Sequence, residues 1–126
     1  MKIDYQRQRP GGMHVSDESS ATDALRAARQ FAARARALVP ECEVRLFGSC
    51  ARGEADAESD VDLLVEVKRP TLTPEVREQL DELAWEVGFA AGRVLQTLVY
   101  SSAELWDTPR RASPLVGAIQ REGILL

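Results

Sequence analysis

Stretches with apolar residues at helical spacing alternate along the chain with short runs of branched apolar residues, and this alternation constrains the fold most. Helical spacing recurs at 20–38 and again at 74–91, where a proline and a glycine bound the second stretch. The runs "EVRLFG", "VDLLVEV" at 61–67 and "VLQTLVY" at 94–100 are typical of strands. This order indicates an α/β domain with helices packed on a sheet.

The two ends of the chain complete the expected organisation. Ser113-Pro114 predicts the start of a further short helix, and the closing "GILL" predicts an edge strand. Residues 1–17 are polar, contain "PGG" and show no period, so we expect a disordered tail there and one domain over 18–126. A chain of 126 residues can bury one ordinary core.

The composition narrows the classes of protein. No apolar run approaches the ~20 residues of a membrane span, and the first twenty residues lack the apolar core of a secretory signal. We therefore expect a cytoplasmic protein without a membrane segment. A net charge of -4 argues against direct nucleic acid binding. Cys42 and Cys50 fit neither a CxxC metal pair nor a disulfide framework, which predicts two reduced thiols.

The pair Gly48-Ser49 directly follows a predicted strand. Glycine lets the backbone turn sharply and leaves room for a large group near its amides, and Ser49 adds a small hydroxyl. If "SCAR" begins a helical turn, its free N–H groups point to the same place and favour a phosphate. Gly-Ser pairs also occur by chance in many turns, so the pair predicts an anion site only together with other residues.

Asp60 and Asp62 stand two residues apart at the start of a predicted strand, so both side chains leave the same face. Two like charges at this spacing repel each other, and a hard cation such as Mg²⁺ removes the repulsion by binding both. The alternative is two solvated carboxylates at the end of a loop. Combined with a phosphate site, the aspartate pair predicts a nucleoside triphosphate.

The stretch at 47–65 resembles the minimal nucleotidyltransferases of the DNA polymerase β-like superfamily. Their pattern is G-S, often followed by x-A-R-G, and then S-D-x-D at the start of a strand. The likeness covers about residues 20–126, since the ending "SPLVGAIQREGILL" is also similar. It implies a small α/β polymerase β-like fold with a mixed sheet of about four strands and helices packed on it. The matching positions are Gly48, Ser49, Ala51, Arg52, Gly53, Ser59, Asp60 and Asp62.

The resemblance implies a role for each motif residue. Gly48 and Ser49 would hold the β and γ phosphates of a nucleotide, and Asp60 and Asp62 would be the catalytic pair that binds Mg²⁺. An acceptor hydroxyl would attack the α phosphorus and receive a nucleoside monophosphate, AMP if the donor is ATP. Arg52 would contact the triphosphate; the interpretation we favour is that it pairs with a loop carboxylate, Asp56 or Glu58.

One departure from the family pattern puts catalysis in question. Active relatives usually carry a third carboxylate on a neighbouring strand, where it completes the metal site and helps to deprotonate the acceptor. The strand at 94–100 offers only Gln96 and Thr97 before Tyr100, and neither can serve as a base near neutral pH. Glu66 shares a strand face with Asp62 but stands ~13 Å away, too far to substitute.

The resemblance also implies a partner. Small stand-alone members are similar to the antitoxins of two-gene modules, which modify or mask a helical ribonuclease toxin of the HEPN family, in some cases by transferring AMP to a tyrosine. The alternative is a binding protein that keeps the fold and neutralises its partner by contact alone. Transfer to a small molecule is a third possibility that the motif does not distinguish.

Two aromatic residues break the amphipathic pattern of the helix expected at 74–91. Trp85 and Phe89 project almost opposite to the apolar stripe, so either the C-terminal segment covers them or they form an interface, for instance in a homo-oligomer. Arg26, Arg29 and two further arginines at 34 and 36 lie on one side of the helix expected at 20–38. A solvated face explains them better than an acidic partner.

Overall fold

The structure is a computed structural model that describes residues 13–54, 56, 58–107, 109 and 113–126. Its helices and strands alternate in the order that the sequence predicts, with one further short helix. The elements in chain order are α2 (Met13–Leu38), β1 (Cys42–Phe47), α3 (Gly48–Ala51), β2 (Val61–Val67), α4 (Pro74–Ala91), β3 (Leu95–Ser101), α5 (Ser102–Trp106), α6 (Pro114–Glu122) and β4 (Ile124–Leu125).

The strands form one four-stranded sheet in the order β3-β2-β1-β4. β2 and β3 run parallel, and the long helix α4 makes the crossover between them, as a parallel connection requires. β1 runs antiparallel to both β2 and β4. The sheet is therefore mixed, which confirms the predicted α/β class with a mixed sheet of four strands.

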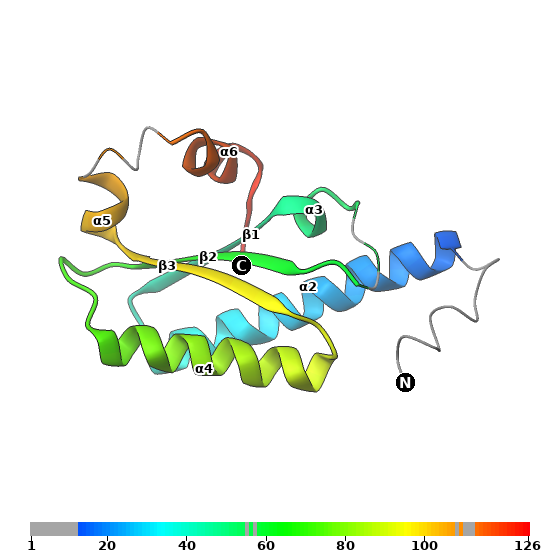
Figure 1. Cartoon of the computed structure of the whole chain (residues 1–126), viewed down its shortest axis with the longest axis horizontal. Coiled ribbons are helices and arrows are strands. Elements are labelled where there is room, and N and C mark those ends of the chain that lie inside the picture. The colour runs from blue at the N-terminus through cyan, green and yellow to red at the C-terminus, as the bar shows by residue number, and fades with distance from the viewer. Residues whose placement is uncertain (1–12, 55, 57, 108, 110–112) are drawn as a thin grey trace.

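The helices lie on both faces of the sheet (Figure 1). The two long helices, α2 and α4, cover one face side by side, and the short helices α3, α5 and α6 lie on the other. β2 is buried from both sides, because Leu63 and Val65 face the α2–α4 layer while Leu64 packs with Leu105 and Ile119 on the other side. This double burial explains the nearly continuous apolar run of the strand.

The bounds of α4 agree with the sequence. Thr73 accepts a hydrogen bond from the backbone N–H of Val76, and Pro74 occupies the first turn, where its missing N–H is not needed. Gly92 ends the helix in the left-handed region at φ 70°. These local signals fix both ends of the helix, so their prediction needed no tertiary information.

The first helix departs from the prediction. α2 begins at Met13, so it includes residues 13–17 of the expected tail, whereas residues 1–12 lie outside the described part of the chain. Leu38 continues the helical spacing of the apolar residues at 20–38, which predicts that it is buried, but it is 44% exposed, while Ala24 and Ala27 are buried. Small residues therefore supply much of the contact between α2 and the sheet.

The short helix α5 was missed. Its start carries a capping box, in which the Ser101 hydroxyl accepts from Glu104 N–H and the Glu104 carboxylate accepts from Ser101 N–H. The sequence signal is the spacing S-x-x-E.

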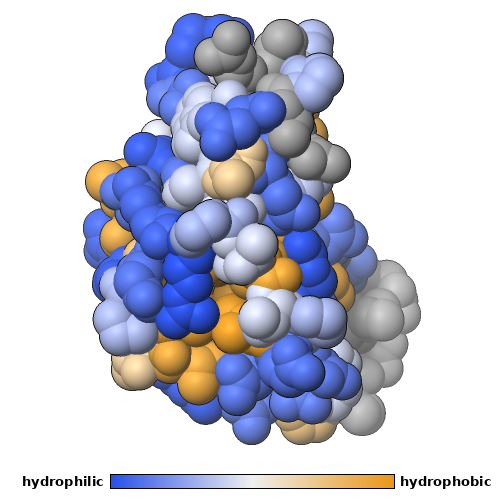
Figure 2. Space-filling view, turned by 90° about the vertical axis from the view of Figure 1, so that its left-hand side faces the viewer, coloured by the Kyte–Doolittle hydropathy of each residue, from blue (hydrophilic) through white to orange (hydrophobic). Residues whose placement is uncertain are grey.

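Over the described ranges, no helix is both long and apolar enough to cross a membrane. On the face shown in Figure 2, apolar side chains gather in the lower half, at the level of α2 and α4.

Candidate active site

The motif residues meet at one end of the sheet. Asp62 in β2 pairs with Phe47, the last residue of β1, on one side and with Gln96 of β3 on the other. Gly48 and Ser49 follow Phe47 at once as the first turn of α3. Three neighbouring strands thus bring the Gly-Ser turn, the aspartates and Gln96 to a single place on the face that carries the short helices.

Gly48 and Asp62 are in close contact. Gly48 has a φ of 76°, which L side chains rarely adopt. A Cβ atom placed there would lie 2.5 Å from Asp62 Oδ2, too close for any real contact. The position therefore requires glycine for two reasons. The backbone has a positive φ, and the Asp62 carboxylate leaves no room for a side chain. The expected sharp turn at Gly48 is present.

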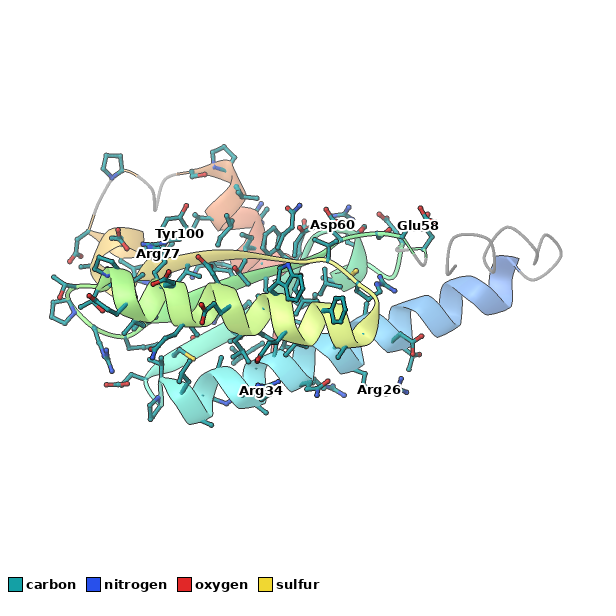
Figure 3. All side chains as sticks on the ribbon, turned by 60° about the horizontal axis from the view of Figure 1, so that its bottom comes forward. Arg26, Arg34, Glu58, Asp60, Arg77 and Tyr100 are labelled. Carbon is teal, nitrogen blue, oxygen red and sulfur yellow. The ribbon has the colours of Figure 1, made fainter. Side chains whose placement is uncertain are left out.

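The electrostatics of the aspartate pair favour a cation. Burial raises the pKa of Asp62 above its ordinary value, and the neighbouring charge of Asp60 raises it further. Both side chains are half-buried, and Figure 3 shows Asp60 beside α3. The available ligands are two carboxylates whose negative charges repel each other, and such a pair fits a hard divalent cation. Among the described residues, no group of three or more His, Cys, Asp or Glu side chains could hold a metal.

Gln96 occupies the place next to the two carboxylates. Its side-chain Nε2 donates to Asp60 Oδ2 over 2.8 Å, and its backbone pairs with Asp62. The neighbouring strand therefore contributes a neutral amide at this position, as the sequence indicated. Thr97 points away, since its hydroxyl donates to Asp81 of α4 over 3.4 Å.

The loop before Asp60 is held by a residue that the sequence did not single out. Arg93 Nη2 donates to the backbone carbonyls of Ser59 at 3.1 Å and Asp56 at 3.3 Å. The Cys50 thiol donates to the carbonyl of Asp60 over 3.3 Å. Arg93 follows the C-cap of α4, and no local motif marks it, because its partners lie 34 and 37 residues earlier in the chain.

The other sequence candidates have definite places. Arg52 forms an exposed ion pair with Glu54 at 2.9 Å, so the loop partner is neither Asp56 nor Glu58 as expected. Ser49 is half-buried in the turn. Cys42 and Cys50 are free and buried, and burial raises the pKa of each thiol, which agrees with the unreactive role predicted for them.

Glu66 is engaged elsewhere. It is only 5% exposed, and its Oε2 accepts from Ser102 Oγ at 2.7 Å and from Trp106 Nε1 at 3.0 Å. This carboxylate ties α5 to the sheet and does not join the aspartate pair. Trp106 is accordingly packed against the sheet and half-buried.

Comparison with known proteins agrees with this geometry. The family described as nucleotidyltransferase domain matches residues 28–116. The chain belongs to this family, which confirms the resemblance seen in the sequence and supports nucleotidyl transfer, with a nucleotide as substrate, as the general function.

A solved structure shares the fold. It is a proposed nucleotidyltransferase from Sulfolobus solfataricus that is 20% identical, with a TM-score of 0.51 over 87% of this chain and 85% of that chain. Among curated proteins, none matches the sequence significantly.

Proposed function

We propose that the protein is a Mg²⁺-dependent nucleotidyltransferase that transfers AMP from ATP to an acceptor hydroxyl. The observation that carries the proposal is the meeting of Gly48, Asp60 and Asp62 at one end of the sheet. A cation and a polyphosphate would share this place, since the carboxylates attract the first and the glycine turn leaves room for the second.

Asp60 and Asp62 would hold the cation. When bound, Mg²⁺ neutralises charge on the phosphates and on the two carboxylates. Gly48 and Ser49 would hold the β and γ phosphates through the backbone of the turn and the serine hydroxyl. Arg93 orients Asp60 indirectly, because it fixes the backbone of the loop that ends there.

The chemical step is a substitution at the α phosphorus. The acceptor oxygen forms a bond to that atom, the bond to the β-phosphate oxygen breaks, and pyrophosphate leaves with the electron pair. The acceptor loses its proton to solvent, because Gln96 cannot take it. Positioning and electrostatics would supply the rate enhancement.

The acceptor would be a hydroxyl on a partner protein, and the motif resemblance favours a helical HEPN toxin. In that setting the protein would act as the antitoxin of a two-gene module. We place the reaction in the cytoplasm, where ATP and Mg²⁺ are abundant.

A second candidate function is a nucleotide-binding protein that neutralises its partner by contact without catalysis. One observation favours it specifically, namely the neutral Gln96 amide that donates to Asp60 where a third carboxylate would stand. The two candidates differ in whether a covalent product forms.

Calorimetry with Mg²⁺ and ATP tests the site itself. The Asp60→Asn/Asp62→Asn double variant is expected to lose about 100-fold or more in affinity, which is ~2.8 kcal/mol. Glu58→Gln is the matched control, because Glu58 is an exposed carboxylate of the same loop, and its affinity should be unchanged. An unchanged affinity in the double variant would remove the proposed metal and nucleotide site.

Transfer is tested by incubating the protein with α-labelled ATP and lysate of its host. A labelled protein band that disappears in the double variant supports the enzyme. A stable unlabelled complex retained by the same bait supports the binding protein.

A further inference from the structure

Helix α4 carries two exposed aromatic rings that the proposed nucleotide site does not use. Trp85 is 68% exposed and Phe89 is 75% exposed, so the C-terminal segment does not cover them. Their rings stack on each other with centroids 5.0 Å apart and planes inclined by 8°. Stacking hides only one side of each ring, and aromatic residues exposed in pairs are typical of protein interfaces.

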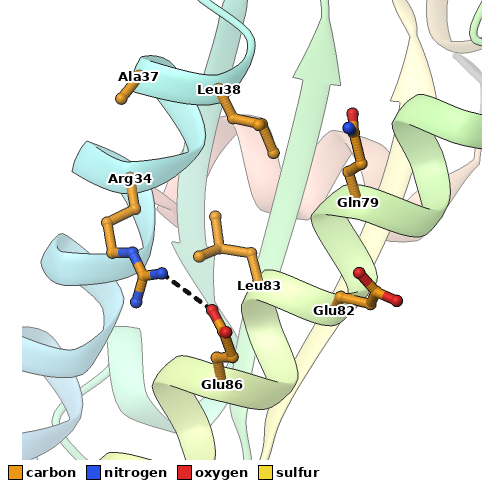
Figure 4. A pocket seen from close by; sticks show the side chains of 7 residues that line it. All are labelled: Arg34, Ala37, Leu38, Gln79, Glu82, Leu83 and Glu86. Atoms are coloured by element: carbon orange, nitrogen blue, oxygen red, sulfur yellow. Dashed lines mark hydrogen bonds and ion pairs between the residues drawn. The ribbon is translucent and has the colours of Figure 1, made fainter.

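Two grooves border this surface. One, of about 400 Å³, lies between α2 and α4 beside Leu38 and Leu83, where Arg34 and Glu86 form an ion pair of 2.9 Å (Figure 4). The other, also about 400 Å³, runs along the aromatic pair with Val94 at its edge. The first groove is lined by both helices, and the second by α4 and the segment that follows it.

The two helices carry opposite charges. Between Thr22 and Leu38, α2 carries four arginines against one aspartate, and α4 carries five acidic residues against one arginine. All the acidic residues of α4 are exposed. The helices lie side by side and run in opposite directions (Figures 1 and 3). The outer surface is therefore divided lengthwise into a basic half and an acidic half with apolar side chains in both.

We propose that this surface binds a second copy of the chain. A two-fold axis that lies in the contact plane, parallel to the helices, sets α2 of each copy over α4 of the other. The basic helix α2 of each copy then faces the acidic helix α4 of the other. Both copies use the same surface, as an isologous interface requires. An axis across the helices would instead set like charges over each other. Charge complementarity therefore selects the partner and its orientation.

The side chains of α2 leave room for the rings. Ala33 and Ala37 are exposed and stand four residues apart on the outer side of the helix. Arg29 and Arg36, also exposed, flank this small-residue surface. In the dimer the rings of Trp85 and Phe89 pack against the alanines of the second copy, and the arginines approach the acidic side chains of α4. Arginine over an aromatic ring adds a cation–π contact.

Sedimentation velocity over a dilution series up to about 100 µM tests the dimer. The wild type is expected to shift from monomer to dimer, and Trp85→Ser/Phe89→Ser to stay monomeric at every concentration. The control is Leu115→Ser, an exposed apolar residue on α6, on the other face of the sheet, which should still dimerise. A monomeric wild type, or a dimer that survives the double variant, overturns the proposal, and the former would assign the surface to another protein.

A charge-swap experiment tests the orientation. The Arg29→Glu/Arg36→Glu variant makes both helices acidic. The Glu75→Arg/Glu78→Arg/Glu82→Arg variant leaves α4 with four basic residues against two acidic ones, so that both helices are basic. Each variant alone is expected to be monomeric, because its helices carry like charges. An equimolar mixture is expected to form a heterodimer in which the acidic helices of one variant lie over the basic helices of the other. A mixture that stays monomeric, with both variants folded by circular dichroism, contradicts the contact of α2 with α4.

Discussion

Gln96 donates its side-chain amide to Asp60 Oδ2 over 2.8 Å while its backbone pairs with Asp62 on the neighbouring strand. A neutral donor therefore contacts the Asp60 carboxylate from the strand next to Asp62. It supports Asp60 but brings no negative charge and no base. This single contact bears on metal affinity and on catalysis alike.

Gln96→Glu should strengthen the binding of divalent cations in the absence of nucleotide. A third carboxylate adds an oxygen ligand and a charge that a cation would compensate, so we expect a gain of about tenfold or more. Calorimetry with Mn²⁺ or Mg²⁺ alone measures this. Gln96→Leu, which removes the amide without adding charge, is the control and should give no gain. Equal affinities for Gln96→Glu and wild type would show that position 96 does not reach the metal.

Asp62→Asn should stabilise the cation-free protein at neutral pH. The pKa of Asp62 is raised in the folded state, so its charged form is disfavoured there, and its contribution to stability falls as the pH rises through the folded pKa. We expect a gain of no more than about 1 kcal/mol, because solvent screens this half-buried group.

The pH dependence supplies the control for Asp62→Asn. The stability difference between variant and wild type should vanish below the unfolded pKa of about 3.9, where the carboxyl is protonated in both states. Chemical denaturation at several pH values in the presence of a chelator measures it. A variant less stable than wild type at pH 7 would mean that the charge of Asp62 is compensated within the protein.

Gly48→Ala should both destabilise the fold and displace Asp62. The added methyl would strain a backbone at φ 76° and contact Asp62 Oδ2, at a combined cost of about 2–4 kcal/mol. Gly53→Ala is the matched control. It has a φ of 75° with nothing within 4 Å of the added Cβ, so only the backbone term of about 1 kcal/mol applies. Urea unfolding of both variants separates the backbone cost from the cost of the contact with Asp62. Equal losses in the free energy of unfolding would contradict that contact.

Trp106→Phe should destabilise the protein by about 1–3 kcal/mol, because Glu66 would lose one of its two side-chain donors in a buried place. Thermal unfolding followed by circular dichroism measures the loss. Trp85→Phe is the control at a dilution where the protein is monomeric, since replacing that exposed ring should cost less than about 0.5 kcal/mol there. A similar small cost for both would show that the indole N–H contributes nothing to holding α5.

Sequence patterns determined the elements that depend on local signals. The strand at 61–67 and the helix at 74–91 were predicted with their observed bounds, because branched residues, Thr73 and Gly92 act within a few residues of where they stand. The Gly48-Ser49 and Asp60-x-Asp62 motif likewise identified the family that comparison confirmed.

Features that depend on contacts across the sheet could not be predicted. That Gln96 reaches Asp60 follows from the register of β3 against β2, and that Arg93 fixes the loop follows from the place where α4 ends. The predicted partner of Arg52 was wrong for a similar reason. Several carboxylates of one loop lie within reach of this long side chain, and the conformation of the loop backbone brings Glu54 to it.

The candidate active site and the proposed dimer surface lie on opposite faces of the sheet, and this placement has a consequence for assembly. The short helices and the aspartates occupy one side, and the proposed self-contact occupies the other (Figure 1). Copies joined back to back would direct their reactive ends outward, so each pair is bivalent and can engage two acceptors without steric conflict. An acceptor that is itself two-fold symmetric would then be bridged, and the angles between the axes would decide between closed rings and open chains.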